Sequence, residues 1–568
     1  MAFDGFVTKA IVNELSSVLL DAKVNKVFEP NSNEIIINFY KNSNKYNLSI
    51  NIDCSNCRIN LTSHSKKNPN NPPSFCMLLR KYLEGNKLTN IYSVGLDRII
   101  VIEFEGYDSS IKDTSSKTLV VELMGKHSNI ILLNNNNVII DSIRHITTPN
   151  SYRYIFPGAI YSFPISNKND FLLLDYNNFL KIVKLYSQDL ISIIQSNFIG
   201  FSKSNLRFIF ESLKINSNEF SESDIKKMYN YLISINEHIL LNKACCSNFN
   251  VENKQDFAID ICEDAKALSI NEFIDSFYYK KESYEEFKIK RNHLLKDILL
   301  KLKKLNCKLK NIDIKLQECS NMDTYKIYGE LITSNLYKIN SNSHLEQIEL
   351  ENYYSNNTPI IIKLDIKYSV IQNAKNFFKK YSKLKNALKI VSLQKEEVKL
   401  EITYLESIVY EIQNSKELED LENISIELYE NNVIMPPKVK NKEKARKSKI
   451  SFNPRKETIN GFEVLVGRNN KENDYLTLKY ASKEDIWFHV KDFHGSHVVL
   501  RINGKQVNDT TLIKCAKLAA FYSQAKASTK VLVQYTKVKN ISKPKNSRPG
   551  MVVFNNYKTL LVNPKIEE

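Results

Sequence analysis

Two long heptad stripes constrain this 568-residue chain more than any other feature of its sequence. An apolar seam that steps alternately by three and four residues must be buried against another helix. Because one chain supplies both stripes, we predict an antiparallel coiled-coil hairpin over residues 273–430 with a small tip at 321–369, whereas dimerisation between chains fits less well. The stripes are Leu295, Ile298, Leu302, Leu305, Leu309, Ile312 and Leu316, then Phe377, Tyr381, Leu384, Leu388, Val391, Lys395, Val398, Ile402, Leu405, Val409 and Ile412.

The segments on either side of the hairpin predict further domains, as expected for a chain too long for one core. Residues 1–170 show a helical pattern at Val7–Leu20 and then strand-like runs, which indicate a mixed α/β domain. Residues 171–272 look helical, and Ile199-Gly200-Phe201-Ser202 between two amphipathic stretches suggests a helix-hairpin-helix, although a plain turn is the commoner explanation. A basic linker at 431–454 precedes an α/β module at 455–568, whose strand-like runs include Tyr475–Tyr480 and Ile486–Val490. The fold class is therefore multidomain α+β.

Net charge is concentrated in the last 131 residues. Residues 438–568 contain 27 Lys and Arg against 11 Asp and Glu, whereas residues 1–437 contain 53 against 52. A neutral body joined to a strongly basic module is typical of a protein that binds a polyanion such as RNA. The linker run is a candidate phosphate tether or simply a solvated linker; its cations are Lys438, Lys440, Lys442, Lys444, Arg446, Lys447 and Lys449.

The basic module also contains the only tryptophan, within a short cluster of aromatic, histidine and arginine residues. Such residues stack on bases and contact phosphate or ribose. Alternate positions of a buried strand would explain the same pattern, and this core alternative is the stronger one for Trp487. The candidate RNA contacts are Trp487, His489, Ser496, His497 and Arg501.

Several kinds of chemistry are excluded or unsupported by the sequence. The 13 glycines form neither a dinucleotide-binding fingerprint nor a P-loop, and no hydrolase motif occurs. Two groups have partial metal-ligand spacing (His489, His494 and His497; Cys54, Cys57, His64 and Cys76), but neither completes a zinc site. We therefore expect no cofactor, no metal and no catalytic residues. Without a signal peptide or a transmembrane run, we expect a cytoplasmic protein with reduced cysteines.

Asp97-Arg98 stands before the strand-like run Ile99–Phe104. An arginine held rigidly can make bidentate contacts with phosphate, with the aspartate accepting a hydrogen bond. From the residues alone, an ordinary turn with an exposed ion pair is the more probable explanation.

The chain resembles the NFACT family, whose older label is fibronectin-binding protein A. The resemblance covers nearly the whole chain in order: the opening Met1–Thr8, the Leu96-Asp97-Arg98 step, Glu122–Asn129, Tyr328–Ile332 and the Asp485–His489 module. It implies an N-terminal domain like that of formamidopyrimidine glycosylases, a helix-hairpin-helix, the coiled-coil hairpin and a C-terminal RNA-binding domain.

The resemblance also implies a function in ribosome-associated quality control. Members bind a stalled large (50S) ribosomal subunit carrying peptidyl-tRNA and recruit alanyl-tRNA. They direct untemplated C-terminal alanine tailing, with a small accessory protein as a further expected partner and no membrane. It implies tRNA binding at Asp97 and Arg98, and at Asp4 as the match of a family aspartate.

Two departures and two alternatives accompany the resemblance. The tip segment 364–369 lacks the prolines associated with it, and Ala2-Phe3 replace the proline and glutamate of a glycosylase, which predicts that glycosylase chemistry is absent. A surface adhesin binding fibronectin is one alternative, and a DNA-binding relative of the glycosylases is the other. Cell fractionation and borohydride trapping on damaged DNA, respectively, test them.

Overall fold

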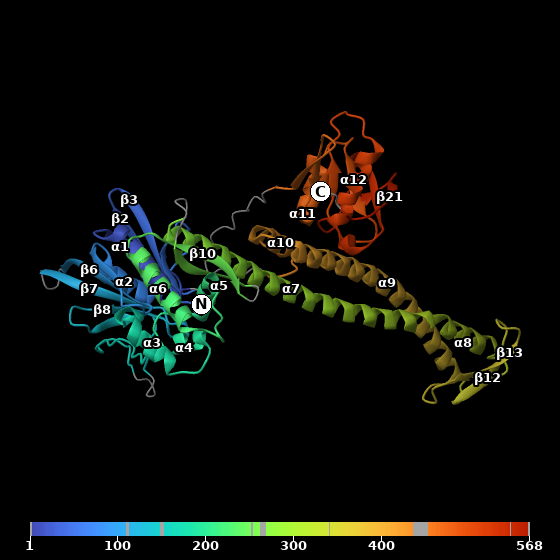
Figure 1. Cartoon of the computed structure of the whole chain (residues 1–568). Helices are drawn as coiled ribbons and strands as arrows, with labels where there is room; N and C mark the ends of the chain where they lie inside the picture. The colour runs from blue at the N-terminus through green and yellow to red at the C-terminus, as the bar shows by residue number, and fades with distance from the viewer. Residues whose placement is uncertain are drawn as a thin grey trace. The chain divides into compact units, whose positions relative to one another are not determined.

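The computed structural model describes residues 3–108, 113–147, 153–251, 254–261, 268–339, 341–435, 452–545 and 547–565. It divides into two compact units, residues 1–283 and 284–568 (Figure 1). The architecture is the multidomain α+β fold predicted from the sequence. None of the helices within the described ranges combines the length and the apolar character that a membrane span requires.

The first unit is built on a nine-stranded antiparallel sheet with the order β4-β3-β2-β1-β5-β6-β7-β8-β9. Helices α1 (Gly5–Leu19) and α2 (Ser74–Leu83) pack against it. A turn at Asn134–Asn137 joins β8 to β9, with Asn137 at φ +57°. The strands are β1 Lys23–Asn31, β2 Glu34–Lys41, β3 Asn44–Asn51, β4 Arg58–Leu61, β5 Lys87–Ser93, β6 Ile99–Asp108, β7 Asp113–Glu122, β8 Asn129–Leu133 and β9 Ile139–Ser142.

Four helices complete the first unit and share one hydrophobic core with the sheet: α3 Tyr176–Lys184, α4 Leu190–Asn197, α5 Lys203–Leu213 and α6 Glu222–Leu240. The purely helical expectation for residues 171–270 is wrong at its end, where β10 (Ala244–Val251) and β11 (Lys254–Ile261) form a hairpin. Alternate residues of β11, including Phe257 and Ile259, are buried on this core, a period-two pattern that the polar residues of β10 obscure.

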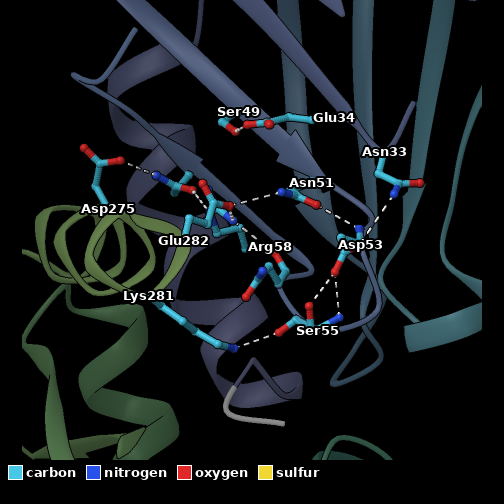
Figure 2. A network of polar contacts seen from close by, with 12 residues as sticks. Asn33, Glu34, Ser49, Asn51, Asp53, Ser55, Arg58, Asp275, Lys281 and Glu282 are labelled. Carbon is cyan, nitrogen blue, oxygen red and sulfur yellow. Dashed lines mark hydrogen bonds and ion pairs between the residues drawn. The ribbon is translucent and has the colours of Figure 1, made fainter. Parts of the chain in front are cut away.

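A polar network fixes the first turns of α7 (Ile270–Ser320) to the sheet (Figure 2). The carboxylate of Glu282 pairs with Arg58 Nη1 at 2.6 Å and with Lys66 Nζ at 2.7 Å. Asp275, two turns earlier, accepts a hydrogen bond from Asn60 Nδ2 at 3.2 Å. Burial raises the pKa of Glu282, but Arg58 and Lys66 outweigh it and hold that pKa below its usual value.

The second unit begins with the coiled-coil hairpin, formed by α7 and α9 (Val370–Asn414). Arg291 Nη2 donates to Gln413 O, Lys301 pairs with Glu401, and Lys395 pairs with Asp313, so the two helices run antiparallel. The heptad residues of both stripes from Leu295 to Leu316 and from Val391 to Ile412 line this seam. Lys395, the one polar break in the stripe, contacts Asp313 at 2.7 Å and so stays at the edge of the seam.

The hairpin carries a small domain at its tip and a short helix at its base. The tip consists of α8 (Met322–Ser334) and the two-stranded sheet of β12 (Gln347–Asn352) and β13 (Thr358–Lys363). Phe377 belongs to the core of the tip and not to the coiled-coil seam. Helix α10 (Leu418–Glu430) packs back on α9 at the base through Leu421, Ile424 and Leu428.

The C-terminal module of the second unit is a six-stranded sheet with the order β14-β15-β17-β16-β18-β21, covered by α12 (Asp509–Phe521). The strand expected at Tyr475–Tyr480 is wrong, because α11 (Asn470–Tyr475) continues there as a π-helical turn. The side chain of Asn469 caps the backbone NH of Glu472 and starts this helix, and local capping overrides the alternating Leu476 and Leu478. The strands are β14 Arg455–Ile459, β15 Phe462–Val466, β16 Ile486–Val490, β17 Val498–Leu500, β18 Val531–Lys537 and β21 Lys558–Val562.

Replacing Arg58 by Met should lower the free energy of unfolding of the first unit by about 3 kcal/mol. This is the lower end of the usual cost of breaking a buried pair, because Lys66 remains beside Glu282. Urea unfolding measures the loss. The difference from wild type should narrow as the pH falls below 4.5, the usual pKa of a glutamate, and through the lower pKa of Glu282 in the folded wild-type protein. Lys87→Met, which breaks the exposed Lys87–Asp21 pair, is the control and should cost less than about 1 kcal/mol. Equal losses in the two variants would contradict the anchoring role of Arg58.

Candidate functional site

Asp4 occupies the N-cap of α1 and is almost completely buried. Its Oδ1 accepts from the backbone NH of Val7 at 3.2 Å, and its Oδ2 accepts from Asn205 Nδ2 at 2.6 Å. Burial raises the pKa of Asp4 to about 6, although these hydrogen bonds and the nearby charge of Arg98 act in the opposite direction. Asn205, on α5, was not among the residues singled out from the sequence, because nothing local links it to a position 201 residues earlier.

The helix-hairpin-helix turn meets the start of α1 backbone to backbone. Gly5 N donates to Gly200 O at 2.9 Å. A Cβ on Gly5 would lie 1.9 Å from Leu96 O, and a Cβ on Gly200 would lie 2.6 Å from the same oxygen. Gly200 also has φ +92°, which favours glycine. Only glycine at both positions permits this close approach, which brings Asp4, the 199–202 turn and the Asp97-Arg98 step together.

The Asp97-Arg98 step lies in the β5–β6 connection, and three hydrogen bonds fix its backbone. Asp97 N donates to Val94 O at 2.9 Å, and Asp97 Oδ1 accepts from Arg98 N at 2.8 Å. Arg98 O accepts from Leu123 N at 2.8 Å. Both side chains are half-buried. The three residues that the resemblance assigns to tRNA, Asp4, Asp97 and Arg98, thus gather in one rigid region, with Arg98 close enough to Asp4 to act on its charge.

In the C-terminal module, Trp487 and His497 belong to the core. Trp487 is 1% exposed and packs on the rings of His489, His497 and Phe554. His497 Nδ1 is 2.8 Å from Thr477 Oγ1, and burial lowers the pKa of His497 well below its usual value. In this conformation neither side chain offers RNA more than a marginal surface, because Trp487 and His497 are both buried. Trp487 and its neighbour Phe488 in β16 belong to two different hydrophobic cores, so both faces of this strand are covered.

The other predicted contacts of the module are more accessible. His489 and Ser496 are half-buried, and burial lowers the pKa of His489 to about 4, so that its ring is neutral at physiological pH. Arg501 Nε is 3.0 Å from Asp485 Oδ2, and its guanidinium lies over the ring of Tyr480. Lys438, Lys440, Lys442, Lys444, Arg446, Lys447 and Lys449 fall outside the described residues. Within the described ranges, His, Cys, Asp and Glu form no group of three or more arranged to hold a metal ion.

A long coiled-coil hairpin and a strongly basic α/β module in one chain define a multidomain α+β protein whose C-terminal module has the charge of an RNA-binding domain. Residues 4–448 match the family described as NFACT N-terminal and middle domains, and residues 451–556 match the NFACT protein RNA binding domain. The chain belongs to the NFACT family.

Similar proteins extend over the full length. The Rqc2 homolog RqcH of Bacillus subtilis is 31% identical over 99% of this chain and 98% of its own. The protein of the same name from Streptococcus pneumoniae is 33% identical, again over 99% and 98%. Among solved structures, the fibrinogen binding protein from Staphylococcus aureus is 27% identical, covers 49% of this chain and 99% of its own, and has a TM-score of 0.41.

Replacing Asp4 by Asn should raise the stability of the first unit, relative to that of wild type at the same pH, as the pH rises from 4 to 7. An aspartate whose pKa is raised from 3.8 to about 6 takes up protons on folding, so its contribution to stability falls as the pH rises through that window. The variant lacks this dependence, and its stability relative to wild type should increase by up to about 3 kcal/mol. Thermal unfolding at the two pH values measures the change.

Asp189→Asn is the matched control, because Asp189 also caps a helix but has a pKa lowered by its hydrogen bonds with Ser192. Its stability relative to wild type should not rise over the same window. A flat profile for Asp4→Asn would show that Asp4 is ionised in the folded protein at much lower pH.

Proposed function

We propose that this protein is a ribosome-associated quality-control factor. It binds large ribosomal subunits that carry peptidyl-tRNA after stalling, recruits alanyl-tRNA, and directs untemplated alanine tailing of the nascent chain, which marks it for degradation. The observation that carries the proposal is the full-length similarity to Rqc2 homologs, 31–33% over 99% of the chain, combined with an RNA-binding domain match at residues 451–556.

The Asp97-Arg98 step is the proposed tRNA contact of the first unit. Its backbone is pinned by Val94 and Leu123, so the Arg98 side chain starts from a fixed position. A planar guanidinium presents paired donors that match phosphate oxygens or the edge of a base, and an adjacent carboxylate can accept from a ribose or base donor. Asp4 helps to position this step, because its carboxylate joins the start of α1 to α5 by accepting hydrogen bonds from Val7 N and Asn205 Nδ2.

The protein positions substrates in this proposal, and the ribosome forms the peptide bonds. The basic module supplies affinity for RNA phosphates that weakens with salt. The coiled-coil hairpin, whose α9 alone has 45 residues and a length of about 65 Å, carries the tip to a distant ribosomal contact. We place the protein in the cytoplasm with stalled subunits, together with a small accessory quality-control protein.

The double variant Asp97→Ala with Arg98→Ala should abolish tRNA recruitment while binding to the large subunit persists. Loss of charge-assisted hydrogen bonds of roughly 1.5–3 kcal/mol predicts a decrease of ten- to a hundredfold or more in tRNA bound to the purified complex. Sequencing of co-purified RNA and the mass of tailed nascent chains measure the effect.

The control replaces Lys184 and Glu222, an exposed ion pair of the same unit 2.7 Å apart, by Ala. It should leave tRNA recruitment and tailing at wild-type levels. Normal tailing by the Asp97–Arg98 variant would show that the assignment of these two residues is wrong.

Neutralising the seven linker cations from Lys438 to Lys449 should weaken RNA binding and flatten its salt dependence. Each cation that contacts a phosphate of a single strand contributes about 0.7 to the slope of log K against log salt. Filter binding over a series of salt concentrations measures the slope. An unchanged slope would mean that the linker cations make no phosphate contacts.

A further inference from the structure

The base of the coiled-coil hairpin is strongly acidic. Residues 401–430, here called the acidic base, contain nine Asp and Glu residues against the single Lys416. They form the end of α9 and all of α10. The rest of the second unit includes the module that carries the excess of positive charge, so one unit contains two segments of opposite charge.

A group of cationic side chains of the module lies against the acidic base. This cationic face consists of Arg455, Arg468, Lys471 and Arg548. Arg468 Nη1 is 3.5 Å from Asp420 Oδ1, Lys471 pairs with Glu430, and Arg548 Nη1 donates to the backbone oxygen of Asn431 at 3.0 Å.

Uncharged contacts accompany these ion pairs. Asn470 Nδ2 donates to Ser407 Oγ at 3.1 Å, and the guanidinium of Arg548 lies 5.4 Å from the ring of Tyr404. The side chains of Arg468 and Lys471 are only 11% and 15% exposed. Arg and Lys reach this degree of burial when they are paired, and Arg468 is paired both with Asp420 and, at 3.1 Å, with Glu472 of the module itself. The acidic base therefore occupies the position that a polyanion would take on this face.

The contact is not tightly packed. A cavity of about 630 Å³ lies between the two surfaces and is lined from the helices by Tyr404, Ser407 and Glu411 and from the module by Arg455, Arg468 and Trp487. The buried Oε2 of Glu411 and Nε1 of Trp487, two residues that line this cavity, have no hydrogen-bond partner among the described residues. In a permanent interface, buried polar atoms of this kind are nearly always paired.

Crowded carboxylates weaken the contact further. Burial and the charge of Glu427 raise the pKa of Glu411 well above its usual value, and burial raises the pKa of Glu427 to about 7 although Tyr404 donates a hydrogen bond to it. Glu472, Asp474, Lys471 and Arg548 are the other charged groups that act on this pair or on Tyr404. Burial makes these two carboxyl groups harder to ionise, so keeping them buried at neutral pH costs free energy. Opening of the interface would relieve this cost.

We propose that the cationic face is an RNA-phosphate site which the acidic base covers in this conformation, so that RNA and the acidic base compete for the same cations. The inference rests on the RNA-binding function proposed above and adds its regulation within the chain. RNA bound by the module would displace the acidic base, and covering of the face would suppress binding to RNA that is not on a stalled subunit. The apparent dissociation constant is then the intrinsic constant divided by the fraction of molecules with an open face.

The test uses the full chain with Glu406→Gln and Glu430→Gln. Both side chains are more than half exposed, and Glu430 pairs with Lys471 while Glu406 lies 3.9 Å from His494. Burial lowers the pKa of His494, so its ring is uncharged at neutral pH and only Glu430 takes part in an ion pair. Removing that pair and the negative charge of Glu406 should increase the open fraction and raise the affinity for a labelled single-stranded RNA of about 16 nucleotides by about three- to tenfold. The control, Glu396→Gln with Glu397→Gln, removes two exposed charges of α9 that precede the acidic base in the chain, and this variant should bind RNA as wild type does.

Trp487 provides an independent measurement, because it is the only tryptophan and lines the cavity. Its emission should shift to longer wavelength in the Glu406–Glu430 variant without RNA, and in wild type when RNA is added. Lys471→Gln should weaken RNA binding in both backgrounds.

The outcomes separate this inference from the proposed function. Tighter RNA binding by the Glu406–Glu430 variant, together with the emission shift, supports competition. Unchanged affinity with normal alanine tailing overturns the competition and leaves the proposed function intact. Failure of the wild-type chain to bind RNA or stalled subunits overturns both.

Discussion

The first unit depends on the close approach of three backbone segments at Gly5, Leu96 and Gly200. A Cβ at either glycine would lie 2.6 Å or less from Leu96 O. The start of α1, the β5–β6 connection and the turn between α4 and α5 can therefore approach this closely only with glycine at both positions. The hydrogen bond from Gly5 N to Gly200 O then joins them. Because Asp4 and the Asp97-Arg98 step are next to these contacts in the chain, their geometry follows from the backbone. Close packing without side chains fixes the backbone from which the Arg98 side chain extends.

Electrostatics organise the second unit in a different way. The coiled coil uses charge at its edges, where Lys301 pairs with Glu401 and Lys395 with Asp313. Its base instead concentrates acidic residues that meet the cations of the module across a loosely packed interface. Pairs that involve an exposed carboxylate, such as Lys471–Glu430, contribute little individually and are screened by salt. A face held by several weak pairs can exchange one polyanion for another, whereas a buried and fully paired network such as Arg58–Glu282 holds its elements in place.

The success of sequence-based prediction varied with how local the deciding interaction was. The heptad seam was predicted correctly from Leu295 to Leu316 and from Val391 to Ile412, because each position follows from the spacing of its neighbours. The strand at Ile486–Val490 was predicted for the same reason. At the start of the second stripe the prediction was wrong, since Phe377 belongs to the tip. The expectation at Tyr475–Tyr480 failed because the cap at Asn469 outweighed an alternating pattern. The β10–β11 hairpin was missed because Ser247, Asn248 and Asn250 interrupt the apolar pattern of its first strand. The position of Asp4 beside Asn205, 201 residues away, had no local signal at all.

The sequence by itself determined the coiled-coil stripes, the basic character of the last 131 residues and the resemblance that points to the NFACT family. Tertiary structure alone decided that Trp487 faces the core, that Asp4 and Arg98 lie together, and that the acidic base opposes the cationic face. The physical reason is that periodicity and charge are sums over neighbouring residues. The meeting of distant segments depends on which backbones can approach each other and which buried groups find partners, and these conditions are met only in the folded chain.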